Sequence, residues 1–261
     1  MNIKILVATH KKYEMPKDKC YIPIHVGRAG KEDIGYIGDN TGDNISKKNP
    51  YYCELTGLYW GVKNLNCDYI GLVHYRRYLS KKKLISIKSK NKFNKILSEN
   101  DIEAILKNYD IILPKKRNYY IETLYSHYAH THYAEHLDET RNIIKEKFNE
   151  YLPYFDLVMK RKNAHMFNMF IMKKKLADEY CDWLFEILKE LENRIEYTSY
   201  DAFQARLFGR VSELLLDVWI EKNNLSFKEV PHIHMEKINW INKGKSFLNA
   251  KFKGKKFKSS F

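Results

Sequence analysis

Three short apolar runs, at residues 3–8, 68–73 and 110–113, constrain the fold of this chain more than any other feature. Each run is shorter than an ordinary helix and is followed at once by polar or basic residues, as is typical of a buried strand. Segments with helical periodicity, at residues 50–62 and 99–107, separate the runs. Strands that alternate with helices predict a doubly wound α/β sheet of the Rossmann type, in which ligands bind at the carboxyl ends of the strands.

The remainder of the chain predicts more helices, over residues 120–150, 176–188 and 200–220, and contains no evident linker. With 261 residues, 44% of them hydrophobic and 14% aromatic, the chain is long enough for one large core. This composition excludes disorder as the main state. We therefore expect one domain over residues 1–241.

Residues 242–261 are expected to form a separate basic tail, because they hold seven Lys and no acidic residue, with Phe interleaved among the cations. Basic residues mixed with Phe suit an anionic membrane surface. The alternative is a frayed, solvated end of the chain.

The net charge of +14 rests mainly on lysine, with 37 Lys against 9 Arg. A diffuse lysine excess fits phosphate-rich or anionic-lipid partners, or coding bias alone. No nucleic-acid-binding motif is present, so no specific nucleic-acid partner is expected. A non-specific nucleic-acid-binding protein remains the alternative from a different functional class.

The four cysteines, Cys20, Cys53, Cys67 and Cys181, form no CxxC pair, which predicts free thiols in a reducing compartment. The first residues lead directly into the first strand, and no stretch approaches the ~18 apolar residues of a membrane span. These features predict a cytoplasmic protein, and the tail adds peripheral contact with the inner face of the plasma membrane as an expectation.

Several motifs are recognisable, in order along the chain: ILVATHKKYEMP (5–16), YIPIHVG (21–27), YIGDNTGDNIS (36–46), NPYYCELTGLYW (49–60), DYIGLVHYRRYL (68–79), FNMFIMKKKL (167–176) and FGRVSELLLDVW (208–219). Together they resemble a bacterial glycosyltransferase family of capsule, O-antigen and exopolysaccharide clusters, formerly a domain of unknown function. Characterised members of that family are β-1,3-galactofuranosyltransferases that use a UDP-sugar donor on a GT-A-like fold.

The resemblance implies a GT-A-like sheet with a helical region on the acceptor side. It also implies inverting transfer of a hexosyl group, with galactofuranosyl as the best match, from a UDP-sugar to a growing glycan or lipid-linked glycan. A metal-dependent transferase of another UDP-hexose is the alternative within enzymes.

The donor diphosphate is expected at the end of the second strand. GT-A enzymes carry an Asp-x-Asp motif there, whereas this chain has His74, Arg76 and Arg77. These residues, helped by Lys11 or Lys12, predict a diphosphate clamp without a metal, so no cofactor is predicted. An ion-paired structural corner is the alternative for the arginines. Mg²⁺ or Mn²⁺ is the alternative for the cofactor.

Four further residues are predicted to contact the donor. Thr9 and His10 follow the first strand, where the resemblance implies contact with the uracil or ribose. Asp39 and Asp43 lie in a glycine-rich loop, and the resemblance implies that they line the ligand cleft. There they would bind sugar hydroxyls or, as the fallback, coordinate a metal as a pair. Turn formation is the alternative for both aspartates.

An inverting transfer needs a carboxylate that deprotonates the acceptor hydroxyl. Asp201, at the start of the 200–220 helix, is the first candidate, with N-capping as its alternative role. Glu213 is the second candidate, with a salt-bridged surface stripe as its alternative. Glu54 is expected to face solvent.

Acceptor-side contacts are predicted at His132, Asp138 and Asn168. The four histidines at positions 127, 130, 132 and 136 lack the HExxH arrangement of a zinc site. They are expected to be solvated or packed against aromatic rings, and no metal site is predicted.

Overall fold

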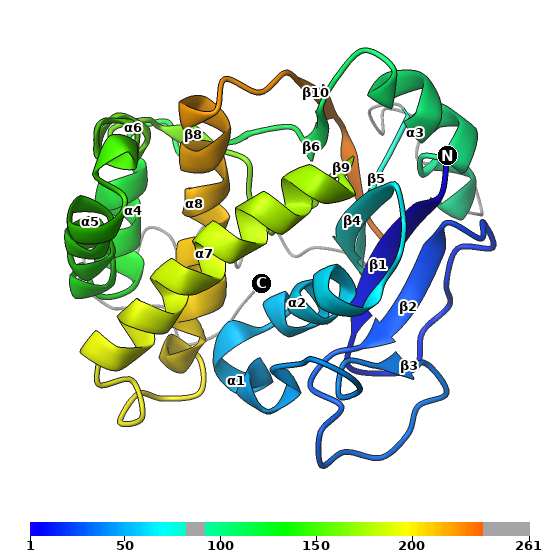
Figure 1. The fold of residues 1–261 in the computed structure, drawn as a ribbon, viewed down its shortest axis with the longest axis horizontal. Helices are drawn as coiled ribbons and strands as arrows, with labels where there is room; N and C mark the ends of the chain where they lie inside the picture. The colour runs from blue at the N-terminus through cyan, green and yellow to red at the C-terminus, as the bar shows by residue number, and fades with distance from the viewer. Residues whose placement is uncertain (82–91, 237–261) are drawn as a thin grey trace.

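A mostly parallel sheet lies at the centre of the computed structural model, which describes residues 1–81 and 92–236 (Figure 1). Within these residues the sheet has nine strands, with the path β10-β6-β9-β4-β1-β2-β3 and a β5–β11 extension on β4. The strands are β1 (Ile3–Thr9), β2 (Tyr21–His25), β3 (Ile37–Gly38), β4 (Tyr69–His74), β5 (Arg77–Leu79), β6 (Ile111–Pro114), β9 (Phe170–Lys173), β10 (Phe227–Val230) and β11 (His232–His234). A separate pair consists of β7 (Arg117–Asn118) and β8 (Asn163–Ala164).

The described residues also form α-helices. They are α1 (Asn49–Tyr52), α2 (Leu55–Asn64), α3 (Glu99–Leu106), α4 (Leu124–Thr131), α5 (Glu135–Lys147), α6 (Leu152–Met159), α7 (Lys174–Arg194) and α8 (Leu207–Lys222). Short 3₁₀ turns occur at Ser46–Lys48, Lys92–Lys95, Asn149–Tyr151 and Gln204–Arg206.

The strand directions bring three strand ends to one edge of the sheet. β1 runs parallel to β4, while β9 is antiparallel to both β4 and β6, so β1, β4 and β6 all point the same way. The prediction of a Rossmann-type sheet is confirmed, with β9 as an antiparallel insertion. Thr9, His74 and Pro114 consequently lie at the carboxyl edge, where such sheets bind ligands.

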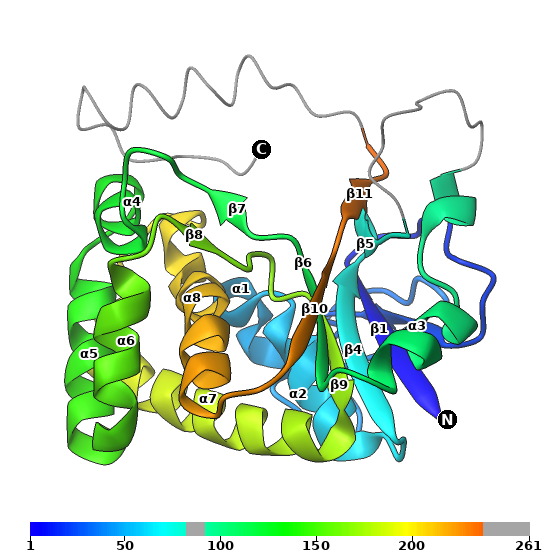
Figure 2. The ribbon, with the colours of Figure 1, turned by 90° about the horizontal axis from the view of Figure 1, so that it is seen from above.

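Side-chain alternation along the strands creates a separate apolar core on each face of the sheet. Leu6 and Leu72 belong to the core shared with α2, α7 and α8, whereas Ile5 and Val73 belong to the core shared with α3. Figure 2 shows α3 on one side of the sheet and α2 and α7 on the other. The central strands β1, β4 and β6 are mainly apolar because both faces are covered.

A helical lobe adjoins the sheet at one end. Figures 1 and 2 both show α4, α5 and α6 together beside α8, far from α3. The helices expected over 120–150 are therefore present, and α6 extends them. β7 and β8 connect this lobe to the sheet, with Arg117 opposite Ala164.

Two predicted helices are interrupted. The helix expected over 50–62 breaks at Cys53, whose φ of 54° lies in the left-handed region that non-glycine residues seldom adopt. Gly209 of α8 packs directly on this break, since a Cβ there would meet Cys53 Sγ at 3.2 Å. The helix expected from residue 200 begins as a 3₁₀ turn and becomes α-helical only at Leu207.

The four cysteines are free, and three of them are buried, as the sequence predicted for the thiols. Across residues 1–81 and 92–236, no helix has both the length and the apolar character needed to cross a bilayer. The tail over residues 242–261 lies outside the described residues.

Candidate functional site

A cavity of about 900 Å³ opens at the carboxyl edge of the sheet and is closed on its other side by α4 and α8. Its lining combines the ends of β1 and β4 with residues from the α1–α2 break, β7, α4 and α8. The charged residues that line it are Lys11, Lys31, Glu54, Arg76, Arg77, Arg117, Arg206, Arg210 and Glu213. Seven cationic side chains therefore face two carboxylates, so the cavity favours an anionic ligand.

The end of β1 forms the first part of the sheet-side wall. Thr9 Oγ1 donates a hydrogen bond to the Lys11 carbonyl at 2.6 Å, which shapes the turn after the strand. His10 lies edge-to-face against Tyr75, and its pKa is lowered by burial and by the nearby Arg76 and Lys11. Of the residues predicted in this segment, Thr9, His10 and Lys11 line the cavity, whereas Lys12 does not.

The end of β4 contributes the arginine pair. Arg77 stacks on the Phe167 ring at 4.6 Å, and its Nε, although buried, has no hydrogen-bond partner within the described residues. Arg76 lies over the Tyr75 ring at 5.2 Å and pairs with Glu236 at 3.4 Å. Both arginines line the cavity, so the structure brings them to the predicted place beside Lys11.

His74 does not act as a cation in the cavity. Its Nε2 is 2.6 Å from the Phe167 carbonyl oxygen, to which it donates, and burial lowers the pKa of the imidazole. A neutral His74 supplies no positive charge for a diphosphate, and its bond fixes the loop before β9. The expectation that His74 belongs to the cationic clamp is therefore corrected to a role in holding the cavity wall.

Three further arginines line the cavity, and the sequence analysis assigned none of them to the site. Arg206 Nε donates to Cys53 Sγ at 3.0 Å, and Arg210 stacks on the Phe203 ring at 4.1 Å. Arg117 follows β6 and lies over the Tyr119 ring at 5.0 Å. The available signal was the grouping of Arg206, Arg210 and Glu213 on one helix face, which reads equally well as a surface stripe.

Glu213 lies in the cavity rather than on the surface. Burial and the neighbouring Glu54 raise its pKa to about 7, against the opposing influence of the Phe167 backbone, Arg77 and Arg117. A carboxylate with a pKa near 7 is well matched to general-base catalysis at neutral pH. Of the two predicted base candidates, Glu213 is the one that lines the cavity.

Glu54 is the second cavity carboxylate, and the expectation that it faces solvent was wrong. The helix is interrupted at Cys53, so Glu54 does not lie on the solvent face of a continuous helix, as the sequence analysis had assumed. Asn168 Nδ2 donates to Glu54 Oε1 at 2.7 Å and to the Gly209 carbonyl at 3.0 Å. Ser212 Oγ in turn donates to Asn168 Oδ1 at 2.8 Å, so the buried Asn168 orients Glu54 and is not itself a lining residue.

The loop between β8 and β9 carries unusual backbone geometry. Phe167 and Asn168 have φ values of 79° and 51°, two consecutive non-glycine residues in the left-handed region. Such conformations cost about 1–3 kcal/mol each and cluster at functional sites. Here they let one loop contact His74, Glu54 and Glu213 together.

Asp201 is exposed and does not line the cavity. Its Oδ1 accepts hydrogen bonds from the backbone N–H groups of Phe203 and Gln204, at 2.8 and 2.9 Å. This is the capping role that the sequence analysis gave as the alternative. The ranking of Asp201 above Glu213 is therefore reversed by the geometry.

Asp39 and Asp43 also lie outside the cavity lining. Asp39 is fully buried and accepts hydrogen bonds from the Gly27 and Arg28 backbones, at 2.8 and 3.0 Å, and from Ser46 and Thr56. Because four donors already occupy its carboxylate, Asp39 stabilises the glycine-rich loop and has no free oxygen for a ligand. Asp43 is exposed and accepts from the Tyr59 hydroxyl at 3.1 Å.

Two of the predicted acceptor contacts, Asp138 and His132, are not exposed to the cavity as expected: Asp138 lies outside it and His132 is nearly buried. Asp138 is exposed on α5, outside the lining, and accepts from the Tyr125 hydroxyl at 2.9 Å. His132 borders the cavity but is nearly buried, with Nδ1 2.9 Å from Gln204 Oε1, and burial lowers its pKa to about 3. Its neighbour His136 packs against Tyr128 and Tyr200, as expected for an aromatic-packed histidine.

The positions of the donor side chains bear on whether a metal could bind. In the described parts of the chain, no three His, Cys, Asp or Glu side chains are grouped as a metal site requires. Asp39 and Asp43 do not form the fallback pair, because the Asp39 oxygens are already occupied. The carboxylates that a cation in the cavity could meet are those of Glu54 and Glu213.

Comparisons with known proteins agree with this fold. A family model described as a domain of unknown function, DUF4422, matches residues 4–224. No curated protein matches the chain. A solved apo structure of WbbM, described as a bifunctional glycosyltransferase, is similar with 32% sequence identity and a TM-score of 0.83 over 91% of this chain. The match covers 46% of WbbM, so this chain spans about half of that protein's length. The chain has a GT-A-like, Rossmann-type α/β fold, and it belongs to the DUF4422 family.

Proposed function

We propose that this protein is an inverting glycosyltransferase that moves a hexosyl group, galactofuranosyl as the leading candidate, from a UDP-sugar to a growing surface polysaccharide. The observation that carries the proposal is the cation-rich cavity at the carboxyl edge of the sheet, which contains a half-buried glutamate with a pKa of about 7. The similarity to a bifunctional glycosyltransferase supports the same reaction class.

The donor diphosphate is assigned to the sheet-side wall. Arg76, Arg77 and Lys11 lie at the ends of neighbouring strands, and the negative charge of the leaving diphosphate increases as the glycosidic bond breaks. Fixed cations aimed at that charge stabilise the transition state more than the ground state. Thr9 and His10 remain the proposed contacts for the uracil or ribose.

The base of the transfer is assigned to Glu213. Inversion requires the acceptor oxygen to attack the anomeric carbon from the face opposite the diphosphate, while a carboxylate takes its proton. Glu213 projects from α8 into the cavity, where Arg77 is among the charged groups that act on it. Glu54, oriented by Asn168, is proposed to hold acceptor hydroxyls and to keep the pKa of Glu213 high.

Two measurements test this proposal. UDP should raise the melting temperature of the protein, because a ligand that binds only the folded state stabilises it. A panel of UDP-sugars should then identify the donor by release of UDP. No UDP effect on melting, together with a salt-sensitive gel shift on DNA, would contradict the transferase and favour the non-specific nucleic-acid binder.

Metal independence and membrane contact remain proposals. The diphosphate clamp is proposed to work without a metal, and the rival is a metal-dependent transferase of another UDP-hexose that uses Mg²⁺ or Mn²⁺ at Glu54 and Glu213.

The basic tail is proposed to hold a cytoplasmic enzyme at the inner face of the plasma membrane. Deletion of residues 242–261 should reduce binding to anionic vesicles and leave UDP binding intact.

A further inference from the structure

Two large apolar side chains are exposed in the loop over residues 120–123, which joins β7 to α4. Tyr120 is 79% exposed and Ile121 is 60% exposed, the two highest fractions among the exposed large hydrophobic side chains of the described residues. The residue that follows them, Glu122, is an acid and is only 4% exposed. Surface loops ordinarily show the reverse arrangement, because hydration favours charged groups over apolar ones. The exposed pair therefore indicates a contact surface.

Backbone hydrogen bonds fix the loop at both of its ends. The N–H groups of Tyr119 and Leu124 donate to carbonyls of residues 161–162, at 2.8 and 2.7 Å. Between these anchors the Ile121 N–H donates to the Tyr119 carbonyl at 2.7 Å, and Tyr120 has a φ of 57°, in the left-handed region. A tyrosine keeps this unfavourable conformation only where neighbouring contacts impose it. The exposure of Tyr120 and Ile121 is thus a fixed feature of the fold.

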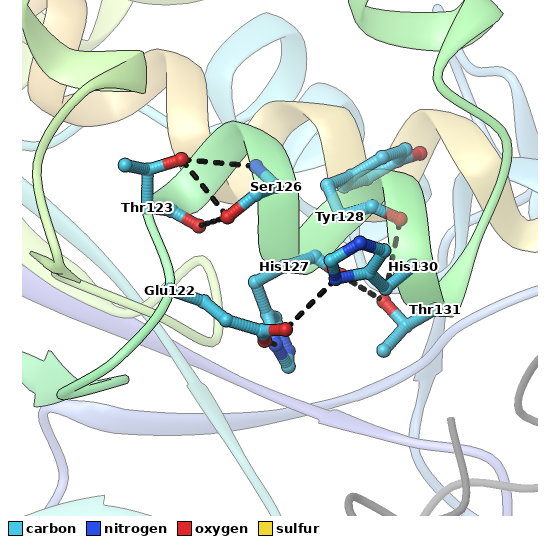
Figure 3. A network of polar contacts seen from close by, with 7 residues as sticks. All are labelled: Glu122, Thr123, Ser126, His127, Tyr128, His130 and Thr131. Carbon is cyan, nitrogen blue, oxygen red and sulfur yellow. Dashed lines mark hydrogen bonds and ion pairs between the residues drawn. The ribbon is translucent and has the colours of Figure 1, made fainter. Parts of the chain in front are cut away.

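The polar side chains of the same loop are held by α4. Figure 3 shows Glu122 just before the first turn of this helix, with His127 and His130 at its carboxylate. The Glu122 oxygens are each 2.8 Å from the Nδ1 atom of one of these histidines. Thr123 caps the helix, since its Oγ1 accepts from the Ser126 backbone N–H at 3.0 Å. The loop's one carboxylate is therefore withdrawn from the surface.

Two basic segments flank the loop. Residues 115–117 (KKR) precede it, and residues 160–162 (KRK) contain the carbonyls that anchor it. Within these segments and the loop, the one acid is the buried Glu122. Arg161 forms an ion pair with Glu221 at 2.7 Å. The lysines that remain exposed are Lys115, Lys160 and Lys162. The surface around the exposed apolar pair is therefore positively charged.

The loop lies at the rim of the cavity. Tyr119 and Leu124, the residues on either side of it, both line the cavity, as does Arg117. Figure 2 shows the connection between β7 and α4 at the top of the view, at the same end of the molecule as β5 and β11. A surface that contacts Tyr120 and Ile121 therefore also lies close to the cavity.

We propose that the Tyr120–Ile121 pair enters the headgroup region of an anionic phospholipid bilayer, so that the folded domain itself holds its cavity against the membrane. The proposal rests on the proposed transferase function for its acceptor, a lipid-linked glycan at that surface, and adds a contact distinct from the basic tail. Tyrosine is stable at the boundary between water and lipid, and isoleucine gains from burial beneath the headgroups. Each cation close to an anionic bilayer strengthens binding about fivefold.

The make-up of this surface favours a bilayer over other occupants. A sugar could stack on the Tyr120 ring, but an uncharged glycan gains nothing from Ile121 or from the exposed lysines. A twofold contact between two copies of this chain would pair the surface with itself and bring like charges together, which is unfavourable. An anionic bilayer uses the apolar pair and the cations at once.

Hydrogen–deuterium exchange on the full-length protein locates the contact. Vesicles of equal parts phosphatidylglycerol and phosphatidylcholine should slow exchange roughly tenfold in peptides that cover residues 119–125. Pure phosphatidylcholine vesicles should protect these peptides much less, because they lack the negative charge. Peptides around Ile37, which is 50% exposed at the far edge of the sheet, are the control and should not change. Unchanged exchange over 119–125, with or without binding through the tail, would overturn the proposal.

Matched variants test the apolar side chains. Tyr120→Asn combined with Ile121→Ser removes both, and asparagine suits a left-handed backbone, so the melting temperature should stay near that of the parent. The affinity of this loop variant for the mixed vesicles should fall about tenfold or more, the loss expected from two apolar side chains. Ile37→Ser, the control, should bind vesicles as the parent does. Equal affinities in the loop variant, the control and the parent would refute the proposal.

The same variants distinguish this proposal from the proposed function. UDP release with a soluble acceptor should be normal in the loop variant, because Tyr120 and Ile121 do not line the cavity, whereas transfer to a lipid-linked acceptor in the mixed vesicles should slow. Absence of UDP binding by the parent would contradict the proposed function, while exchange and vesicle affinity still decide the membrane contact.

Two other results would assign the loop to a different partner and so overturn the proposal. A higher KM for a soluble acceptor in the loop variant, with unchanged vesicle affinity, would identify a glycan-binding surface. A parent dimer in light scattering that the loop variant loses, again with unchanged vesicle affinity, would identify an interface between two copies of the chain.

Discussion

Replacement of Glu213 by glutamine should separate catalysis from stability. Glutamine keeps the size of the side chain but cannot take a proton, so the rate of transfer should fall by about 10²–10⁴-fold, as is typical when general-base assistance is lost. UDP affinity should change much less than the rate, because the diphosphate is assigned to the cations Lys11, Arg76 and Arg77, which the substitution leaves in place. In the parent enzyme, the rate should rise with pH and level off above a pKa of about 7.

The same substitution should stabilise the folded protein at alkaline pH. The pKa of Glu213 is raised from 4.5 to about 7 on folding, so the folded state binds this proton more tightly than the unfolded chain. The parent therefore loses stability as the pH rises from 4.5 to 7, and the loss is complete above 7. At about 1.4 kcal/mol for each unit of pKa, the penalty at pH 8 is about 3 kcal/mol as an upper estimate. Glutamine carries no charge and removes this penalty.

Urea unfolding at pH 5 and pH 8, together with UDP release, measures both effects. The gain in unfolding free energy for Glu213→Gln should be large at pH 8 and small at pH 5. Asp201→Asn is the matched control, since an amide can still cap the turn and should leave the rate nearly normal. A Glu213→Gln protein that keeps its activity, or whose stability shows the same pH dependence as the parent, would refute the reasoning.

Three other predictions concern the donor side and the loop that supports it. Arg76→Ala and Arg77→Ala should each weaken UDP binding by ~1.5–3 kcal/mol in calorimetry, and unchanged affinity in both folded variants would return them to a structural role. Donor turnover should survive EDTA, and complete loss that Mn²⁺ restores would contradict the metal-free clamp. Asp39→Asn should lower the unfolding free energy by about 1–3 kcal/mol for each backbone or hydroxyl donor left without an acceptor, while the folded fraction binds UDP normally. Normal stability in that variant would refute the structural role of Asp39.

Local patterns were sufficient for most of the fold. The apolar runs at 3–8, 68–73 and 110–113 correspond to β1, β4 and β6, because a strand buried on both faces needs a mostly apolar sequence. The order of strands in the sheet and the antiparallel insertion of β9 depend on pairing between segments that are distant in the sequence. Hydrophobic periodicity within one segment carries no information about such pairing.

The candidate site was only partly predictable, for one physical reason. Residues placed directly after a strand, such as Lys11 and Arg77, could be assigned because strand ends of one direction share an edge. Residues on helices could not be assigned, because their direction depends on what each helix packs against. Asp201 and Glu213 belong to the same predicted helix, yet one caps a turn at the surface and the other lies in the cavity.

The sequence by itself determined the α/β class, the strands whose ends form the cavity edge, and the excess of cations there. Tertiary structure decided which carboxylates work beside those cations. The turn at Cys53 directs Glu54 inward, and the packing of α8 against α7 and the helical lobe places Glu213 half-buried at the cavity wall. Burial is a property of the assembled elements, and burial raises the pKa of Glu213 to about 7, so its fitness as a base arises only on folding.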